Sequence, residues 1–203
     1  MSQQDRDKWN SRYAEDSYRK GNPVTLLEDW LPKLSAGKAL DIACGAGRNS
    51  LFMAHAGFDV DAIDISREGL LKARQSAESE GFDINWIEHD LDQPYDFDDD
   101  YDLIVVMWYV NLPLIKRLCD CLVPGGVMIC EEHLITTDPT VIGPRTADFR
   151  VAPGALREAT ASLEVLHYQE SIESNSEGEA VASARVVAKH GSRRSHSGGQ
   201  LVF

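Results

Sequence analysis

The chain has 203 residues, a length suited to one domain with a substantial hydrophobic core. Its formal net charge of −13 opposes binding to nucleic acid, because phosphate contacts require clustered lysines and arginines. No run of about eighteen apolar residues occurs, and the amino terminus lacks the apolar core of a signal peptide. We therefore expect a cytoplasmic protein with neither nucleic acid nor membrane as a partner.

Two short helices are predicted before the first strand. The first covers residues 5–14 and places Trp9 and Tyr13 on one face, because they lie four positions apart. The plainest role for this aromatic pair is packing on the core. The second helix covers residues 25–31 and is ended by Pro32.

Residues 39–50 carry the motif around which the other elements can be placed. Their sequence, Ala-Leu-Asp-Ile-Ala-Cys-Gly-Ala-Gly-Arg-Asn-Ser, predicts a buried strand, a turn permitted by Gly45 and Gly47, and a helix start. The helix is expected to end at Gly57. Because free N–H groups at a helix start favour an anionic group, we expect a nucleotide-type cofactor beyond the end of this strand.

A second strand is predicted over residues 59–64, and its last residue is an acid seventeen positions after Gly47. An acid at about this distance from a glycine turn holds a ribose diol in open α/β sheets. Ser50 stands in place of the third glycine of the dinucleotide fingerprint, so that fingerprint is matched only in part.

The middle of the chain predicts one capped helix and two strands. Ser66 is expected to cap a helix that runs to about Glu80 and is closed by Gly81. A strand over residues 84–89 follows. The next strand, residues 103–108, is apolar without alternation, as a strand covered on both faces requires.

The carboxyl-terminal half predicts a helix, a Pro-Gly-Gly turn, a strand, a long irregular segment, a short helix and two strands. Their ranges are 113–121, 122–126, 127–131, 132–153, 154–160, 163–170 and 180–189. Because only a polar loop joins the last two strands, we expect them to form an antiparallel hairpin. Residues 191–203 have the composition of a mobile tail.

Neither the cysteines nor the acidic run predicts a metal site. The four cysteines show no CxxC spacing and are expected to be reduced thiols packed as small hydrophobes. The aspartates of residues 96–102 lack the spacing and the glycine of a calcium loop, so a solvated loop is expected.

Residues 40–47 resemble motif I of the class I S-adenosylmethionine (SAM) methyltransferases, with Ala43 where that family usually has its first glycine. Residues 9–13, 48–50 and 143–145 look most like the tellurite-resistance and thiopurine branch of small-molecule methyltransferases. The resemblance implies an α/β fold: a Rossmann-like, doubly wound, seven-stranded, mostly parallel sheet with a carboxyl-terminal antiparallel hairpin. A single domain over residues 1–190 is expected, with residues 1–35 as a helical cap.

The resemblance also implies SAM as the cofactor and S-adenosylhomocysteine as its product. It assigns Asp41 to the SAM amino group or to the glycine loop, Asp64 to the ribose and Asp90 to the adenine amino group. Asp90 has a simpler alternative as a turn residue. In this family the segment with Trp9 and Tyr13 lies across the cofactor. The expected cofactor-binding residues are Trp9, Tyr13, Asp41, Ala43, Cys44, Gly45, Gly47, Arg48, Asn49, Asp64, Ile65, Asp90, Leu91, Met107 and Trp108.

The irregular segment 132–153 carries the residues expected to act on the methyl acceptor. If the nucleophile is a thiolate or a chalcogen oxyanion, Arg145 and Arg150 are expected to hold the anion. If it is a hydroxyl or an amine, His133 is the expected general base. The alternatives are strand-end packing for His133 and a surface charge for Arg145.

The predicted function is therefore transfer of a methyl group from SAM to a small-molecule acceptor, by a monomer or a homodimer. Two other functions remain open: a nicotinamide-dependent oxidoreductase, and a SAM-binding module without catalytic activity. A methyltransferase of RNA or protein is disfavoured by the acidity of the chain.

Overall fold

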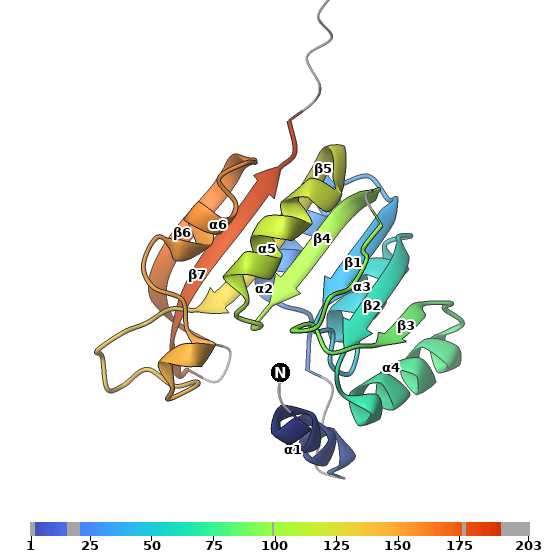
Figure 1. Ribbon diagram of the computed structural model, residues 1–203, viewed down its shortest axis with the longest axis horizontal. Coiled ribbons are helices and arrows are strands. Elements are labelled where there is room, and N and C mark those ends of the chain that lie inside the picture. Colours follow the sequence, from blue (N-terminus) through green and yellow to red (C-terminus); the bar gives the residue numbers. More distant parts are fainter. Residues whose placement is uncertain (1–2, 16–20, 99, 176–177, 192–203) are drawn as a thin grey trace, which may run out of the picture.

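The computed structural model describes residues 3–15, 21–98, 100–175 and 178–191. Seven strands form one sheet in the order β3-β2-β1-β4-β5-β7-β6 (Figure 1). The strands are β1 Lys38–Ile42, β2 Asp59–Asp64, β3 Asn85–Glu88, β4 Tyr101–Met107, β5 Leu122–His133, β6 Glu164–Ser174 and β7 Ala180–Lys189. The first five run parallel, whereas β7 is antiparallel to both of its neighbours, which confirms the predicted sheet and its terminal hairpin.

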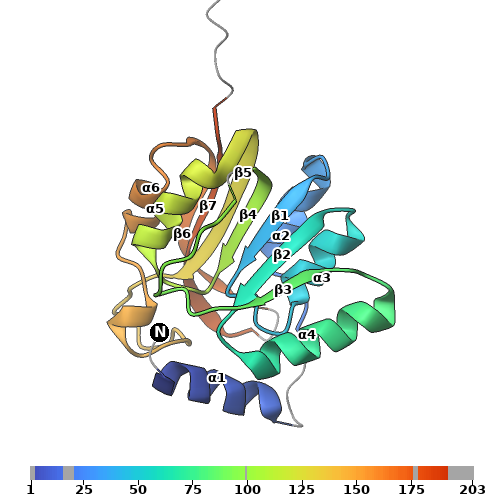
Figure 2. The same ribbon diagram turned by 45° about the vertical axis from the view of Figure 1, so that its right-hand side comes forward.

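Helices cover both faces of the sheet and create two apolar cores. They are α1 Gln3–Ala14, α2 Thr25–Trp30, α3 Arg48–His55, α4 Arg67–Glu80, α5 Leu112–Leu118 and α6 Ala155–Ala159. Side chains of α2, α3 and α4 belong to the core on one face, and those of α5 and α6 to the core on the other. Figure 2 shows α1 apart from both layers, below the edge where the parallel strands end.

Helix α4 begins and ends where the sequence predicts, because its caps are local. The Ser66 hydroxyl accepts a hydrogen bond from the Gly69 N–H at 3.1 Å, and Gly81 is left-handed with φ 78°. Helix α5 has a similar start, where the Asn111 side chain accepts from the Leu114 N–H at 3.0 Å.

Three predicted boundaries are wrong. Residues 122–126 do not separate a helix from β5 but belong to the strand: Tyr101 pairs with Leu122 and Leu103 with Val127. The residues between Leu122 and Val127 form a bulge, which the left-handed Gly125 accommodates without ending the pairing.

The other two errors concern a proline and a polar strand. Pro32 lies inside a 3₁₀ turn, Leu31–Lys33, that continues from α2. Strand β6 extends to Ser174, although its last residues are polar, because all of them pair with β7. The mobile tail is predicted over residues 191–203. Of these, only Gly191 belongs to the described residues.

Within the described part of the chain, every helix is too short or too polar to cross a lipid bilayer.

Candidate cofactor and acceptor site

The turn after β1 has a backbone that few side chains tolerate. Ala43, Gly45 and Gly47 have φ values of 55°, 57° and 76°. A Cβ at Gly45 would lie 2.3 Å from the Tyr13 hydroxyl, and one at Gly47 would lie 2.8 Å from both the Ala73 side chain and the Trp86 ring. Gly47 is therefore required for packing, while Gly45 lets another group approach the turn.

Asp64 joins this turn to the end of β2. One of its carboxylate oxygens accepts from the Gly45 N–H at 2.8 Å and the other from the Ser66 N–H at 2.7 Å. Burial raises its pKa to about 6, although these hydrogen bonds oppose the rise. Because a carboxylate accepts about four hydrogen bonds, Asp64 can hold the turn and still accept from ligand hydroxyls.

Asp41 is buried beneath the same turn. The Ser50 hydroxyl donates to its carboxylate at 2.5 Å, which ties β1 to the first turn of α3. Burial raises the pKa of Asp41 to about 7, with the Ser50 hydrogen bond and the Arg48 charge opposing. Of the two roles expected for Asp41, this contact favours orienting the glycine loop.

Two other residues of the motif support the turn from inside. Asn49 is buried, and its side chain accepts from the Val24 N–H at 3.1 Å, so it anchors the chain before α2. Cys44 is buried as well, and burial raises the pKa of its thiol. The expected contact of either residue with the cofactor remains a prediction.

Helix α1 rests on the turn through Asn10 and Tyr13. The Asn10 side-chain oxygen accepts from the Ser66 hydroxyl at 2.8 Å and from the Glu68 N–H at 3.3 Å. Trp9 stacks on Tyr13 with ring centroids 5.9 Å apart. No residue of α1 is buried, so the aromatic pair does not pack in the core. Asn10 was missed from the sequence, although it lies within the Trp-Asn-x-Arg-Tyr motif.

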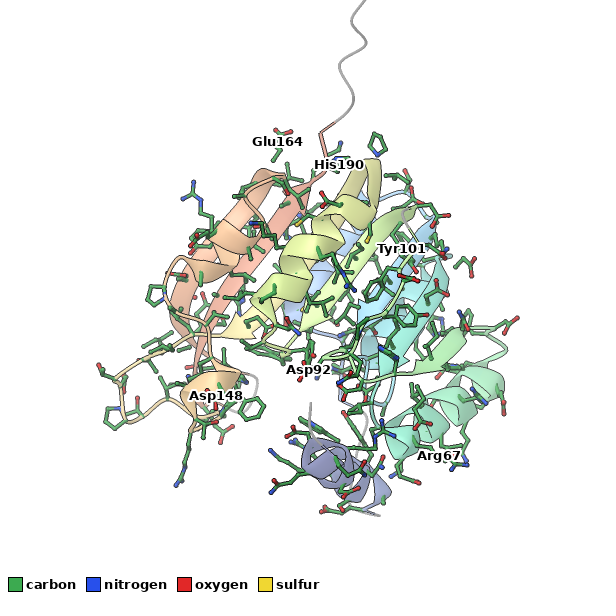
Figure 3. The ribbon with its side chains drawn as sticks, in the orientation of Figure 1. Arg67, Asp92, Tyr101, Asp148, Glu164 and His190 are labelled. Atoms are coloured by element: carbon green, nitrogen blue, oxygen red, sulfur yellow. The ribbon has the colours of Figure 1, made fainter. Side chains whose placement is uncertain are left out.

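Residues at the ends of β2 and β3 offer an apolar floor beside Asp90. Ile65 and Leu91 are buried. Asp90 accepts from the Asp92 N–H at 3.0 Å, and Asp92 in turn accepts from the Tyr109 hydroxyl at 3.2 Å. Figure 3 shows Asp92 near the carboxyl ends of the strands, with Tyr101 and Glu164 toward the opposite edge.

Trp108 directly follows β4 and has a left-handed backbone with φ 62°, a costly conformation for a bulky residue. Its N–H donates to the Glu131 carbonyl at 2.9 Å. Its ring contacts the His133 ring, with centroids 4.3 Å apart and the planes tilted by 35°. Met107, just before it, is buried.

Glu132 supports this turn and was missed from the sequence. It is fully buried, and one carboxyl oxygen accepts from the Tyr109 N–H at 3.0 Å. The other oxygen has no partner within the described part of the chain, and burial raises the pKa well above its usual value. The sequence feature that could have indicated Glu132 is a pair of adjacent acids, Glu131 and Glu132, near the end of an apolar strand. Glu131 is satisfied by Arg185 at 2.7 Å.

His133 lies at the end of β5 and faces the irregular segment. Burial and the nearby Arg150 charge lower its pKa to about 4. Its Nδ1 atom has no partner among the residues that the structure describes. His133 is therefore neutral near pH 7 and a weak base there.

Arg150 holds the irregular segment together. Its Nε, Nη1 and Nη2 atoms donate to the carbonyls of Pro144, Leu134 and Ile142 at 2.6, 2.7 and 3.3 Å. These contacts give Arg150 a structural role, and its expected contact with an anion remains a prediction. Arg145 is different: it is exposed and makes no hydrogen bond or ion pair with the described residues.

A hollow of about 650 Å³ lies within this segment. Its lining is Ile135, Thr136, Asp138, Pro139, Thr140, Val141, Ile142, Gly143, Pro144, Arg145, Ala147 and Arg150. The segment and α1 lie side by side below the sheet in both ribbon views (Figures 1 and 2). Lys8 of α1 lies 5.3 Å from the Phe149 ring centroid.

Two aspartates of the acidic run after β3 pair with a lysine. The Lys38 ammonium lies 2.6 Å from Asp98 and 3.0 Å from Asp100. Within the described ranges, no cluster of histidine, cysteine or acidic side chains could hold a metal ion, and the four cysteines are unbridged.

Residues 39–126, which include the glycine turn and strands β1 to β4, match the family model of a methyltransferase domain. Over this segment the chain is similar to known methyltransferase domains, and the fold and the relatives below agree with that match.

The curated relatives of this chain include TehB. A probable SAM-dependent methyltransferase TehB of Haemophilus influenzae (strain 10810) is 29% identical over 169 residues, 78% of this chain and 58% of the relative. The chain thus spans a little over half the length of this curated relative. The crystal structure of TehB from Haemophilus influenzae superposes with a TM-score of 0.71 at 23% identity, covering 91% of this chain and 66% of that chain.

A second solved structure shares the fold over nearly its full length. It is the N-methyltransferase NodS from Bradyrhizobium japonicum WM9 in complex with S-adenosylhomocysteine. The TM-score is 0.68 at 17% identity, and the match covers 91% of this chain and 97% of that one.

Proposed function

We propose that the chain transfers the methyl group of SAM to a small-molecule acceptor. The observation that carries this proposal is the contact between the Asp64 carboxylate and the Gly45 N–H, 2.8 Å apart at the adjoining ends of β1 and β2. It sets an acid beside a stretch of left-handed backbone, at the position where open α/β sheets bind nucleotides. The names of the relatives support the same cofactor.

The residues present fit SAM part by part. Gly45 and Gly47 have no side chains of their own to block the methionine portion, and the Tyr13 hydroxyl lies over Gly45. Asp64 can accept from the ribose hydroxyls. Asp90 can accept from the adenine amino group, with Ile65 and Leu91 as the apolar floor. Met107 and Trp108 close the site at the end of β4.

When bound, SAM supplies a methyl group on a sulfonium sulfur, and this carbon accepts an electron pair as its bond to that sulfur breaks. The residues of this chain orient and desolvate the reactants. Tyr13 and Trp9 cover the glycine turn from α1, and Trp108 and His133 form the wall toward the irregular segment.

The lowered pKa of His133 favours acceptors that need no general base. A neutral imidazole with a pKa of about 4 gains little by taking a proton near pH 7. A thiolate or another nucleophile that is already anionic reacts without one. Arg145 remains the residue we propose for holding the acceptor, and residues 1–190 the extent we propose for the single domain.

Thermal unfolding with SAM, S-adenosylhomocysteine and NAD in parallel tests the cofactor. A ligand at about a hundred times its dissociation constant stabilises the fold by about 2.7 kcal/mol, which raises Tm by about 5–11 °C at this size. We expect this shift with both adenosyl compounds and none with NAD. A shift with NAD alone would replace the proposal with a nicotinamide-dependent oxidoreductase.

A further inference from the structure

We propose that the hollow in segment 134–153 binds an organic acceptor with an apolar body and one anionic group, and that Arg145 holds that group. The inference rests on the proposed methyl transfer and names the class of its acceptor. It goes against a free inorganic oxyanion as the acceptor.

The size of the hollow is the first argument. Its volume of about 650 Å³ lies within the range of about 300–1,000 Å³ that is usual for organic ligands. An inorganic oxyanion such as selenite or tellurite would fill only a small part of it.

The lining is the second argument. Half of its members are apolar: Ile135, Pro139, Val141, Ile142, Pro144 and Ala147. Ile135 and Ile142 are 42% and 40% exposed. Phe149, the last residue of the 3₁₀ turn Ala147–Phe149, is 41% exposed. Large apolar side chains left in water around a hollow indicate a surface that a ligand covers. A small, fully hydrated anion gains nothing from such a lining.

The hollow is also preformed. Besides the three carbonyl contacts of Arg150, the Ile135 N–H donates to the Val151 carbonyl and the Ile142 N–H to the Ala180 carbonyl, both at 2.9 Å. Asp138 accepts from the Thr140 N–H and hydroxyl at 2.9 and 2.7 Å. The segment therefore does not have to order itself when it binds a ligand, which favours binding.

Among the charged side chains that line the hollow, Arg145 is the one placed to bind an anionic group. Arg150 is engaged by carbonyls, and the one acid of the lining, Asp138, is held by Thr140. Arg145 lines the hollow and has no partner among the described residues. Guanidinium binds carboxylate and phosphate oxygens in the same planar geometry.

The hollow reaches the edge where methyl transfer is proposed. A Cβ at Gly143 would lie 3.1 Å from the His133 ring, and that ring contacts the ring of Trp108 at the end of β4. An acceptor anchored at Arg145 can therefore extend its nucleophile past Gly143 toward His133. The nucleophile's electron pair forms the bond to the methyl carbon, and the bonding pair of the broken bond stays on the sulfur of the departing cofactor.

Titration calorimetry of the full chain with three probes tests this inference. The probes are 4-phenylbutyrate, with body and charge, 4-phenylbutan-1-ol, with body alone, and selenite, with charge alone. Each is titrated with and without saturating S-adenosylhomocysteine. We expect saturable binding of phenylbutyrate, binding of the alcohol weaker by about three- to tenfold because Arg145 is exposed and screened, and none of selenite.

Variants separate the two parts of the site. Arg145→Gln should reduce the affinity for phenylbutyrate to that for the alcohol, whereas Arg74→Gln, an equal charge change on the exposed face of α4, should leave it unchanged. Ile142→Ser should weaken both organic probes equally. Selenite binding in the absence of organic binding, or equal affinities in the wild type and Arg145→Gln, would overturn the inference. Failure of S-adenosylhomocysteine to bind would contradict the proposed function. It would leave the test of the hollow intact, because the probes are also titrated without S-adenosylhomocysteine.

Discussion

Asp64 serves two partners with one carboxylate. It fixes the glycine turn through the Gly45 N–H and the start of α4 through the Ser66 N–H, and it can accept further hydrogen bonds, which we propose come from the ribose. Its removal should therefore reduce cofactor affinity more than a surface acid of the same strand would.

We predict that Asp64→Asn weakens SAM binding by about 1.5–3 kcal/mol, the usual scale for a hydrogen bond to a charged group. Asp59→Asn is the matched control, because Asp59 begins the same strand and is exposed. Calorimetric titration with SAM measures both variants. Equal affinities for the two would remove Asp64 from the site.

Asp41 should make stability depend on pH. Its folded pKa of about 7 lies above its ordinary 3.8, so its contribution is fully present below pH 3.8 and is lost as pH rises through 7. Asp41→Asn cannot ionise. Between pH 5 and pH 8, the free energy of unfolding of Asp41→Asn should rise by about 1–3 kcal/mol relative to that of the wild type. Denaturant unfolding at both values measures this; a constant difference would show that Asp41 does not titrate there.

Glu132 should control the turn that carries Trp108. Glu132→Ala removes the acceptor of the Tyr109 N–H and should destabilise the fold by about 1–3 kcal/mol, the cost of a buried unpaired donor. Glu132→Gln keeps a carbonyl acceptor and should cost less. Denaturant unfolding gives the two energies, and near-ultraviolet circular dichroism reports the Trp108 environment. Equal losses for both variants would refute this role.

At the scale of elements, α1 differs from the other helices in how it is attached. It buries no residue and contacts α4 through Asn10, with Tyr13 beside the glycine turn and Lys8 over Phe149. Few buried apolar contacts imply a low local stability. The helix is well placed to respond to ligands on either side of it.

We expect the amides of α1 to exchange with solvent faster than those of α4 in the free chain, and to slow down when S-adenosylhomocysteine binds. Asn10→Ala should reduce that slowing. Hydrogen exchange followed by mass spectrometry measures both helices in one experiment, so α4 serves as the internal reference. Exchange in α1 as slow as in α4 without ligand would contradict the account.

Elements could be predicted from sequence where their signals are local. The bounds of β2 and α4 follow from an acid at a strand end, a Ser66 cap and Gly81. The bulge in β5 could not be predicted, because Pro-Gly-Gly also suits a turn and only pairing with β4 decides between them. Long-range contacts, which a single sequence does not show, make the difference.

The same limit applies to the site. The turn, Asp64 and the long segment can be recognised from sequence motifs. The roles of Arg150 and Glu132 depend on the residues that surround them after folding. Arginine is a residue type that often binds anions, but Arg150 donates hydrogen bonds to three backbone carbonyls. Glu132 looks like a surface acid until burial leaves one oxygen without a partner among the described residues.

For the whole molecule, the sheet brings a cofactor half and an acceptor half to one edge. The ends of β1, β2 and β4 build the first, and the segment after β5 builds the second, with Trp108 and His133 between them. The family match covers residues 39–126 and therefore most of the first half, while the second half lies beyond it. We therefore propose that the loop after β5 determines the choice of acceptor.

Methyl transfer by this chain can be measured as the release of S-adenosylhomocysteine from SAM, followed by mass spectrometry across a panel of thiols, organic acids bearing a thiol, and selenite. The account predicts release that depends on an acceptor and appears together with the methylated product. It predicts the fastest release for acceptors that combine an apolar body, an anionic group and a thiol. SAM binding with no release for any acceptor would contradict it and leave a binding module without catalytic activity.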